Sequence, residues 1–410
     1  MAFSRPWSFF FFALVVALIP SEGRAVDFDV EASTSGGSTR NLFSDSTNRN
    51  DTYSSTSVEL NWYPQSFARV NLAGAYTYYG NFFKLSNLVY GGGLTLIPMP
   101  DSSRFSIYLE SNLKKREYRQ SEVDTTSLNA NEITGDEQDV SLGVGYHINS
   151  TTQLRTGFHF QSTQYQLDGV IDHERADVIT GANTTLFGSL AIDLELGYST
   201  GNYQFVDPME IVPGIPEFGI PDTTVERRAI DPGEQYSILL IDRLKSYYIS
   251  PRLSGALGRK TGWAITYSHR RFIDTDEDAV IYGYSTGYLS PWLNDYAGQA
   301  VILRTKTYLV SSLIISFSAG FWEREHIPTV ENELKPNRFG QLVPVVNLIY
   351  AQQRTDWRRR IDFKFQIPLH IGTAATLEPS LEFDYTDNNS TVAVYDYHDF
   401  AVSGGVTVRF

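Results

Sequence analysis

Charged residues alternate with apolar residues along two neighbouring stretches near the carboxyl end of the chain, residues 357–369 and 377–385. A two-residue period places alternate side chains on opposite faces of a β-strand, so the charged residues of each stretch share one face. A turn at 370–373 predicts that the two stretches form a hairpin. The mostly basic row is Arg358, Arg360, Asp362 and Lys364, and the acidic row opposite it is Glu378, Glu382 and Asp384.

Opposed rows of this kind can do two different things, and the sequence leaves both open. They can line a water-filled pore and steer charged solutes with a transverse electric field. They can instead form a cross-strand charge ladder that only satisfies the wall. Either way they need a wet face, because an Arg or Lys that faces lipid near the membrane midplane costs about 2–4 kcal/mol. Asp193 and Glu195, together with the acids at 27, 29 and 31, predict a weak preference of such a pore for cations.

The same alternation recurs through most of the chain and predicts about sixteen strands, with fourteen and eighteen as alternatives. Short turns such as 149–152 alternate with longer polar connections such as 38–51. This asymmetry is typical of a transmembrane barrel and has no reason to occur in a soluble sandwich. Residues 341–351 are apolar on both faces and are expected to form either an extra strand with its own partner or an extended loop. The predicted fold class is all-β, a transmembrane antiparallel up-and-down β-barrel.

The last stretch of the chain alternates in the same way and ends on an aromatic residue. Val406, Val408 and Phe410 share its apolar face. In this respect the chain resembles the outer-membrane β-barrel proteins of Gram-negative bacteria, whose final strand commonly ends on an aromatic residue. The resemblance implies that these three residues are an assembly signal for the barrel-assembly machinery. It also implies a location in the bacterial outer membrane, with outer-membrane lipid as a partner.

The first residues have the pattern of a secretory signal peptide. Arg5 precedes an apolar run over 9–19, and the small residues Gly23 and Ala25 suit cleavage after Ala25. The run is too short to span a bilayer as a helix, although an uncleaved anchor is the alternative interpretation. The expected division is therefore a signal peptide over 1–25 and a transmembrane β-barrel over 26–410.

The longest connection, residues 205–235, contains five prolines with apolar residues between them. A connection of this length is usually functional, and this one is too apolar for a solvated tail. It is predicted to be a lid or a plug folded into the pore; a structural loop packed on its neighbours is the alternative. The constriction residues expected here are Ile211, Pro213, Ile215, Pro216, Phe218 and Ile220.

Composition argues against several classes of function. The chain has no Cys, which removes disulfides, c-type haem attachment and thiolate metal sites. Its net charge of -14 argues against nucleic acid as a partner. No Gly-rich phosphate loop, His-Glu-x-x-His or EF-hand pattern occurs, so no cofactor and no metal are expected. The 25 Tyr, 25 Phe and 6 Trp suit aromatic girdles at two membrane interfaces.

Two histidines with acidic neighbours are the only candidates for catalysis that the sequence offers. His173 lies beside Asp172 and Glu174, and His398 lies close to Asp396 and Asp399, both near expected strand ends. Nucleophilic catalysis needs a base within hydrogen-bond reach of the nucleophile, and sequence spacing does not establish such contact. We therefore expect no catalytic residue, and a rim-located hydrolase is the least favoured alternative.

In architecture alone, the chain loosely resembles the porin-like barrels associated with exopolysaccharide and other export systems. The resemblance implies an aqueous channel that passes small hydrophilic solutes or a secreted polysaccharide, with export-system proteins as possible partners. The alternative is a structural or interaction barrel whose lumen is plugged by the 205–235 connection and gated by a partner.

Overall fold

The computed structural model describes most of the chain outside the long connections. The described residues are 27–40, 50–81, 86–98, 103–118, 134–165, 172–187, 189–204, 244–273, 281–284, 296–309, 312–326, 329–336, 342–347, 354–372 and 375–410. The expected signal peptide and the six expected constriction residues lie outside them.

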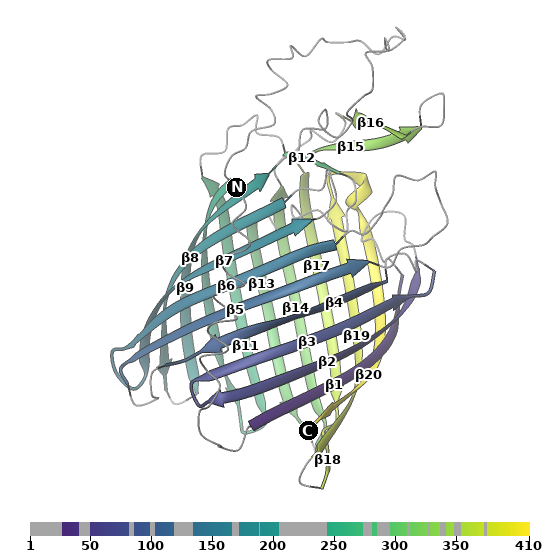
Figure 1. The fold of residues 1–410 in the computed structure, drawn as a ribbon. Helices are drawn as coiled ribbons and strands as arrows, with labels where there is room; N and C mark the ends of the chain where they lie inside the picture. Colours follow the sequence, from purple (N-terminus) through teal and green to yellow (C-terminus); the bar gives the residue numbers. More distant parts are fainter. Residues whose placement is uncertain are drawn as a thin grey trace.

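Sixteen long strands form one closed antiparallel barrel, which confirms the predicted fold class and strand number (Figure 1). They are β1 (Asp27–Thr39), β2 (Asp51–Gln65), β3 (Ala68–Tyr79), β4 (Asn87–Leu96), β5 (Phe105–Tyr118), β6 (Thr134–His147), β7 (Thr152–Tyr165), β8 (Asp172–Leu186), β9 (Leu190–Gln204), β10 (Leu244–Leu257), β11 (Thr261–Ile273), β13 (Ala297–Tyr308), β14 (Ile314–His326), β17 (Arg354–Gln366), β19 (Ala375–Ser390) and β20 (Tyr397–Arg409). Short β18 (Leu369–Ile371) extends the β17–β19 hairpin, and a 3₁₀ turn (Ala393–Tyr395) precedes β20.

The first and last strands close the barrel. β1 pairs with β2 on one side and with β20 on the other. The terminal residue takes part in this seam, because the Phe410 N–H donates to the Val30 carbonyl at 2.9 Å and the Val30 N–H donates to the Phe410 carbonyl at 3.3 Å. A closed barrel leaves no strand edge with unpaired backbone groups, which is the condition for crossing lipid with strands.

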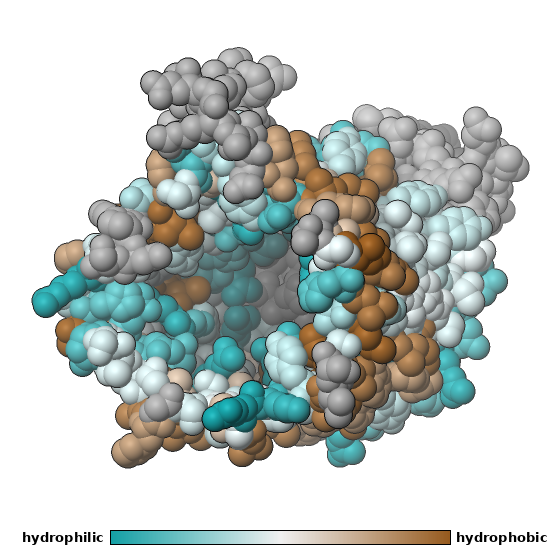
Figure 2. Space-filling model, turned by 90° about the horizontal axis from the view of Figure 1, so that it is seen from below, coloured by the Kyte–Doolittle hydropathy of each residue, from teal (hydrophilic) through white to brown (hydrophobic). Residues whose placement is uncertain are grey.

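The outward face of the barrel is apolar and the inward face is polar. Large apolar side chains are exposed on alternate positions, for example Leu72 (55%), Val178 (51%) and Leu381 (42%), whereas few apolar residues of the described part of the chain are buried. Figure 2 looks into one end of the barrel and shows hydrophilic residues around the hollow, with hydrophobic residues gathered on the outer surface. This arrangement inverts that of a soluble protein, and it fits a wall with lipid outside and water inside. Among the described residues, no helix is long and apolar enough to cross a membrane.

The two ends of the barrel differ in their connections. At the turn end, successive strands are joined by short segments, such as 66–67 between β2 and β3 and 258–260 between β10 and β11. At the loop end, the connections are longer, up to the one between β9 and β10, which runs from 205 to 243. The alternation of short and long connections is as the sequence predicts.

The doubly apolar stretch 341–351 forms a strand outside the barrel. Within it, β16 (Leu342–Asn347) pairs antiparallel with β15 (Thr329–Pro336), and β15 pairs parallel with β12 (Ile281–Tyr284). This separate three-stranded sheet lies beyond the loop end (Figure 1). The stretch is therefore an extra strand with its own partner, and for this reason the barrel has sixteen strands and not eighteen.

Candidate functional site

The opposed rows on β17 and β19 meet in register on the inward face. Asp362 is paired with Asp384 and Lys364 with Glu382. The Arg360 Nε atom donates to Asp362 Oδ1 at 2.8 Å and to Asp384 Oδ2 at 2.7 Å, while Lys364 Nζ lies 3.6 Å from Glu382 Oε2. Arg360 therefore lies between two carboxylates that would otherwise repel each other. These contacts amount to a charge ladder, and the same residues also border open space.

Two cavities adjoin this ladder. Arg360, Asp362, Lys364 and Glu382 line one of about 990 Å³, which extends along the wall to residues of β10, β11, β13 and β14. Arg358 lines another of about 290 Å³ together with residues of β19 and β20. The two interpretations of the rows, wall ladder and wet pore surface, are thus compatible in this structure, because the lumen side of the ladder borders open space.

Glu378 lies apart from these cavities, at the closing seam of the barrel near the turn end. The Arg409 guanidinium donates to Glu378 Oε1 at 2.6 Å and to Glu31 Oε2 at 2.8 Å. Three adjacent strands, β19, β20 and β1, are thereby tied together next to the terminal Phe410. This position gives Glu378 a part in holding the seam closed.

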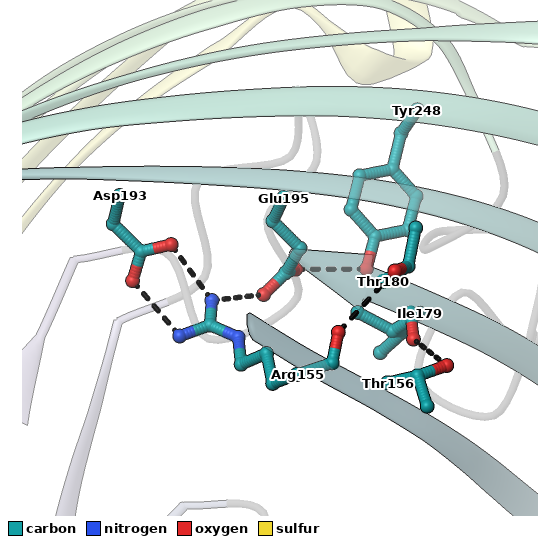
Figure 3. A network of polar contacts seen from close by, with 7 residues as sticks. All are labelled: Arg155, Thr156, Ile179, Thr180, Asp193, Glu195 and Tyr248. Atoms are coloured by element: carbon teal, nitrogen blue, oxygen red, sulfur yellow. Dashed lines mark hydrogen bonds and ion pairs between the residues drawn. The ribbon is translucent and has the colours of Figure 1, made fainter. Parts of the chain in front are cut away.

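Asp193 and Glu195 on β9 share one arginine that sequence reasoning did not connect with them. Arg155 of β7 donates through Nη1 and Nη2 to the two Asp193 oxygens, both at 2.9 Å, and through Nη2 to Glu195 Oε2 at 2.9 Å (Figure 3). The Tyr248 hydroxyl of β10 donates to the other Glu195 oxygen at 2.9 Å. This network spans four strands, and it neutralises much of the negative charge that the two acids bring to the lumen.

Arg155 reaches β9 by crossing over β8 at a glycine. Gly181 is the register partner of both Arg155 and Glu195, and a Cβ at this position would lie 3.2 Å from Arg155 Nε. The alternation of β7 places Arg155 on the polar face, but only the register reveals that the intervening residue lacks a side chain.

A second network lies nearer the loop end of the same wall. The His159 Nε2 atom is 2.9 Å from Asp139 Oδ2, and its Nδ1 atom is 3.2 Å from Asp177 Oδ2. Arg175 Nε donates to the remaining oxygen of Asp177 at 2.9 Å. Both ring nitrogens face carboxylates, so a doubly protonated ring satisfies both acids at once.

The four consecutive strands that follow β9 around the barrel carry cations and no carboxylate on their inward face, among the residues described. We call β10, β11, β13 and β14 the basic wall; its inward cations are Arg252, Arg270, Arg304, Lys306 and Arg324. The acids of β14, Glu323 and Glu325, alternate to the outward face. Arg252 and Arg304 are exposed in the larger cavity and form no ion pair within the described ranges.

The nine strands β1 to β9 carry most of the inward acids among the described residues, and β17, β19 and β20 carry the others. Those of β1 to β9 include Asp29, Glu31, Glu59, Glu110, Glu137, Asp139, Asp177, Asp193 and Glu195. Charge is therefore separated across the lumen and not only between neighbouring strands. Alternation gives the face of each charge, but the separation emerges only when the strands close into a ring.

Of the two rim histidines, only His398 has its side chain within the described part of the structure. His398 lies on the outward face of β20, while Asp399 points inward and accepts a hydrogen bond from Thr39 Oγ1 at 2.9 Å. His173 is paired in register with Thr163 at the loop end, and its side chain lies outside the described part of the structure. No group of three or more His, Cys, Asp or Glu side chains suitable for a metal ion occurs among the described residues.

Comparison with known proteins gives matches to solved structures only. No protein-family model and no curated protein matches the chain. OpdK of Pseudomonas aeruginosa, solved with vanillate, is 9% identical with a TM-score of 0.42, covering 94% of this chain and 99% of that one. OccAB2 of Acinetobacter baumannii is 10% identical with a TM-score of 0.43 (94% and 98% covered), and a bacterial polysaccharide outer-membrane secretin is 10% identical with a TM-score of 0.45 (93% and 98% covered). At these values the matches carry no conclusion about what passes through this chain.

Proposed function

We propose that this chain is a channel of the bacterial outer membrane through which small hydrophilic solutes diffuse. Two features together carry the proposal: the outer face of the barrel is apolar, and the inward face has exposed cations. The cations Arg252 and Arg304 line a cavity and have no ion-pair partner among the described residues. Unpaired cations need water, so the interior beside them is wet. A barrel of sixteen strands is wide enough to enclose an aqueous channel.

The separated charges give the channel a transverse field. A polar or zwitterionic solute that enters the lumen aligns with this field, positive end toward the acids of β1 to β9 and negative end toward the basic wall. Salt screens such a field over about 8 Å at physiological ionic strength, so it acts on solutes that pass close to the wall. Small polar and charged solutes are therefore favoured over apolar ones.

The experiment is single-channel conductance of the refolded protein in a planar lipid bilayer. Steady conductance through a barrel that resists unfolding by detergent at room temperature is the expected result. A folded but silent barrel would overturn the diffusion-channel proposal. In that case, conductance gained on deletion of residues 208–232 would identify a lumen plugged by the 205–235 connection.

A further inference from the structure

Three arginines gather on the lumen wall near the loop end. Arg270 of β11 and Arg324 of β14 are both register neighbours of Gly298 on β13, one on each side. Arg358 of β17 is the register partner of Trp322, which lies two residues before Arg324. Arg324 and Arg358 lie close enough to repel each other electrostatically. The basic wall and the adjoining strand β17 therefore concentrate positive charge on one patch.

None of these arginines forms an ion pair within the part of the chain that the structure describes. Asp356 is the register partner of Arg324, but Arg354 Nε donates to its Oδ1 atom at 2.8 Å. The Nε atoms of Arg324 and Arg358 are buried without a hydrogen-bond partner among the described residues. The buried Nε–H of each group forms no hydrogen bond among the described residues, and an anion bound at the terminal N–H groups of the same guanidinium offsets its charge.

An aromatic ring holds two of the guanidinium groups in place. The Tyr296 ring centroid lies 4.6 Å from Arg324 Cζ and 5.7 Å from Arg270 Cζ. Contact with a ring face stabilises a guanidinium while leaving the N–H groups of its edge free to donate. That edge matches a carboxylate, which accepts two parallel hydrogen bonds from it.

A flat apolar surface adjoins the arginines. The Trp322 indole lies over Gly320 on the same strand, where any Cβ would overlap the ring. Trp322 is on the inward face, beside Arg358 in register and 5.9 Å from Arg324 Cζ across its ring. An indole face of this kind carries the negative part of the ring's quadrupole, so it packs against the weakly positive C–H groups on one face of a sugar ring and keeps its N–H at the edge.

We propose that Arg270, Arg324, Arg358 and Trp322 form a binding subsite for an acidic saccharide, a hexuronate, near the loop end of the lumen. The arginine edges bind its carboxylate, and the sugar ring stacks on Trp322. This inference rests on the proposed function and names a solute class that one patch of the lumen wall binds, while the lumen as a whole keeps its weak preference for small cations. A simple anion would use the arginines alone and would make no contact with the indole face.

The test measures binding of glucuronate to the folded full-length barrel in detergent by calorimetry, and its block of channel current in a bilayer. We expect glucuronate to bind at least about tenfold more tightly than acetate or inorganic phosphate, and glucose to bind weakly. Arg324→Gln and Arg358→Gln should each weaken glucuronate binding about tenfold. Arg324→Lys should weaken it by an intermediate amount, because Lys keeps the positive charge but cannot donate two parallel hydrogen bonds to a carboxylate. Trp322→Leu should reduce the preference for glucuronate over acetate.

Arg359→Gln is the matched control, because Arg359 follows Arg358 directly and lies on the outward face of β17. It should leave glucuronate binding unchanged. Phosphate or acetate binding as tight as glucuronate would overturn the saccharide site, as would equal losses in the Arg358 and Arg359 variants. Conductance without glucuronate binding refutes this inference and leaves the channel intact, whereas binding without conductance refutes the diffusion channel alone.

Discussion

The Tyr248 ring lies over Gly197 on the neighbouring strand and donates its hydroxyl to Glu195 at 2.9 Å. A Cβ on Gly197 would overlap the ring, so the glycine is what allows the ring to lie along the wall. The hydrogen bond in turn links β10 to the Arg155 network of β7 and β9. Tyr108 lies over Gly143 in the same way on the other side of that network.

Gly197→Val should therefore displace Tyr248 and break its hydrogen bond to Glu195. We expect a loss of about 1–3 kcal/mol in the free energy of unfolding, the usual cost of overpacking. Urea unfolding in detergent micelles measures it. Gly74→Val is the control, because a Cβ at Gly74 meets nothing within 4 Å. Equal destabilisation by both variants would contradict this account of Gly197.

Arg155→Ala should leave Asp193 and Glu195 facing each other without a cation. Because the Arg155 side chain is 37% exposed, solvent screens the contact, and we expect a loss of only about 1–2 kcal/mol in unfolding free energy. Arg155→Ala combined with Asp193→Asn and Glu195→Gln should recover part of the loss. Additive costs in the combined variant, measured by the same urea unfolding, would show that the three residues are not coupled.

The charges of the lumen predict a weak preference for cations, because the inward acids of β1 to β9 exceed the inward bases there. Reversal potentials in a salt gradient measure the preference. Arg304→Glu should increase it, and Asp193→Asn should decrease it, since both positions face the lumen. Arg271 lies on the outward face of β11, so Arg271→Glu should leave the cation preference unchanged. Anion selectivity of the unmodified protein would contradict the prediction.

Deletion of Phe410 should reduce the amount of folded barrel in cells. The deletion removes two backbone hydrogen bonds to Val30 at the closing seam and also removes the terminal aromatic residue of the expected assembly signal. Phe410→Tyr keeps the backbone pair and an aromatic ring and should assemble normally. The fraction of outer-membrane protein with the compact gel mobility of a folded barrel reports the result. If the signal matters more than the seam, Phe410→Ala, which keeps the backbone pair, will assemble as poorly as the deletion.

The sequence by itself predicted the strands, their approximate number and the face on which each charge lies. Alternation over 357–369 and 377–385 is local, since each residue points opposite to its neighbour whatever the strand packs against. The rows that contain Lys364 and Glu382 are joined by a short turn, so alternation and the turn together place the two rows on one face of neighbouring strands. The same rule places Arg155 and Arg252 on polar faces, but it assigns no partner to either of them.

Only the tertiary structure decided which charges meet. Arg155 reaches Asp193 because register sets Gly181 between them, and Arg324 lacks an ion-pair partner among the described residues because Asp356 is bonded to Arg354. In the basic wall, the described residues of β10, β11 and β13 include no acid, and the acids of β14 face outward. The pairing of β1 with β20 closes the barrel, so this wall and the acidic strands then border the same lumen. Contacts between side chains depend on the register of neighbouring strands and on the size of the residue between the side chains. A two-residue alternation along one strand gives neither the register nor the identity of that intervening residue.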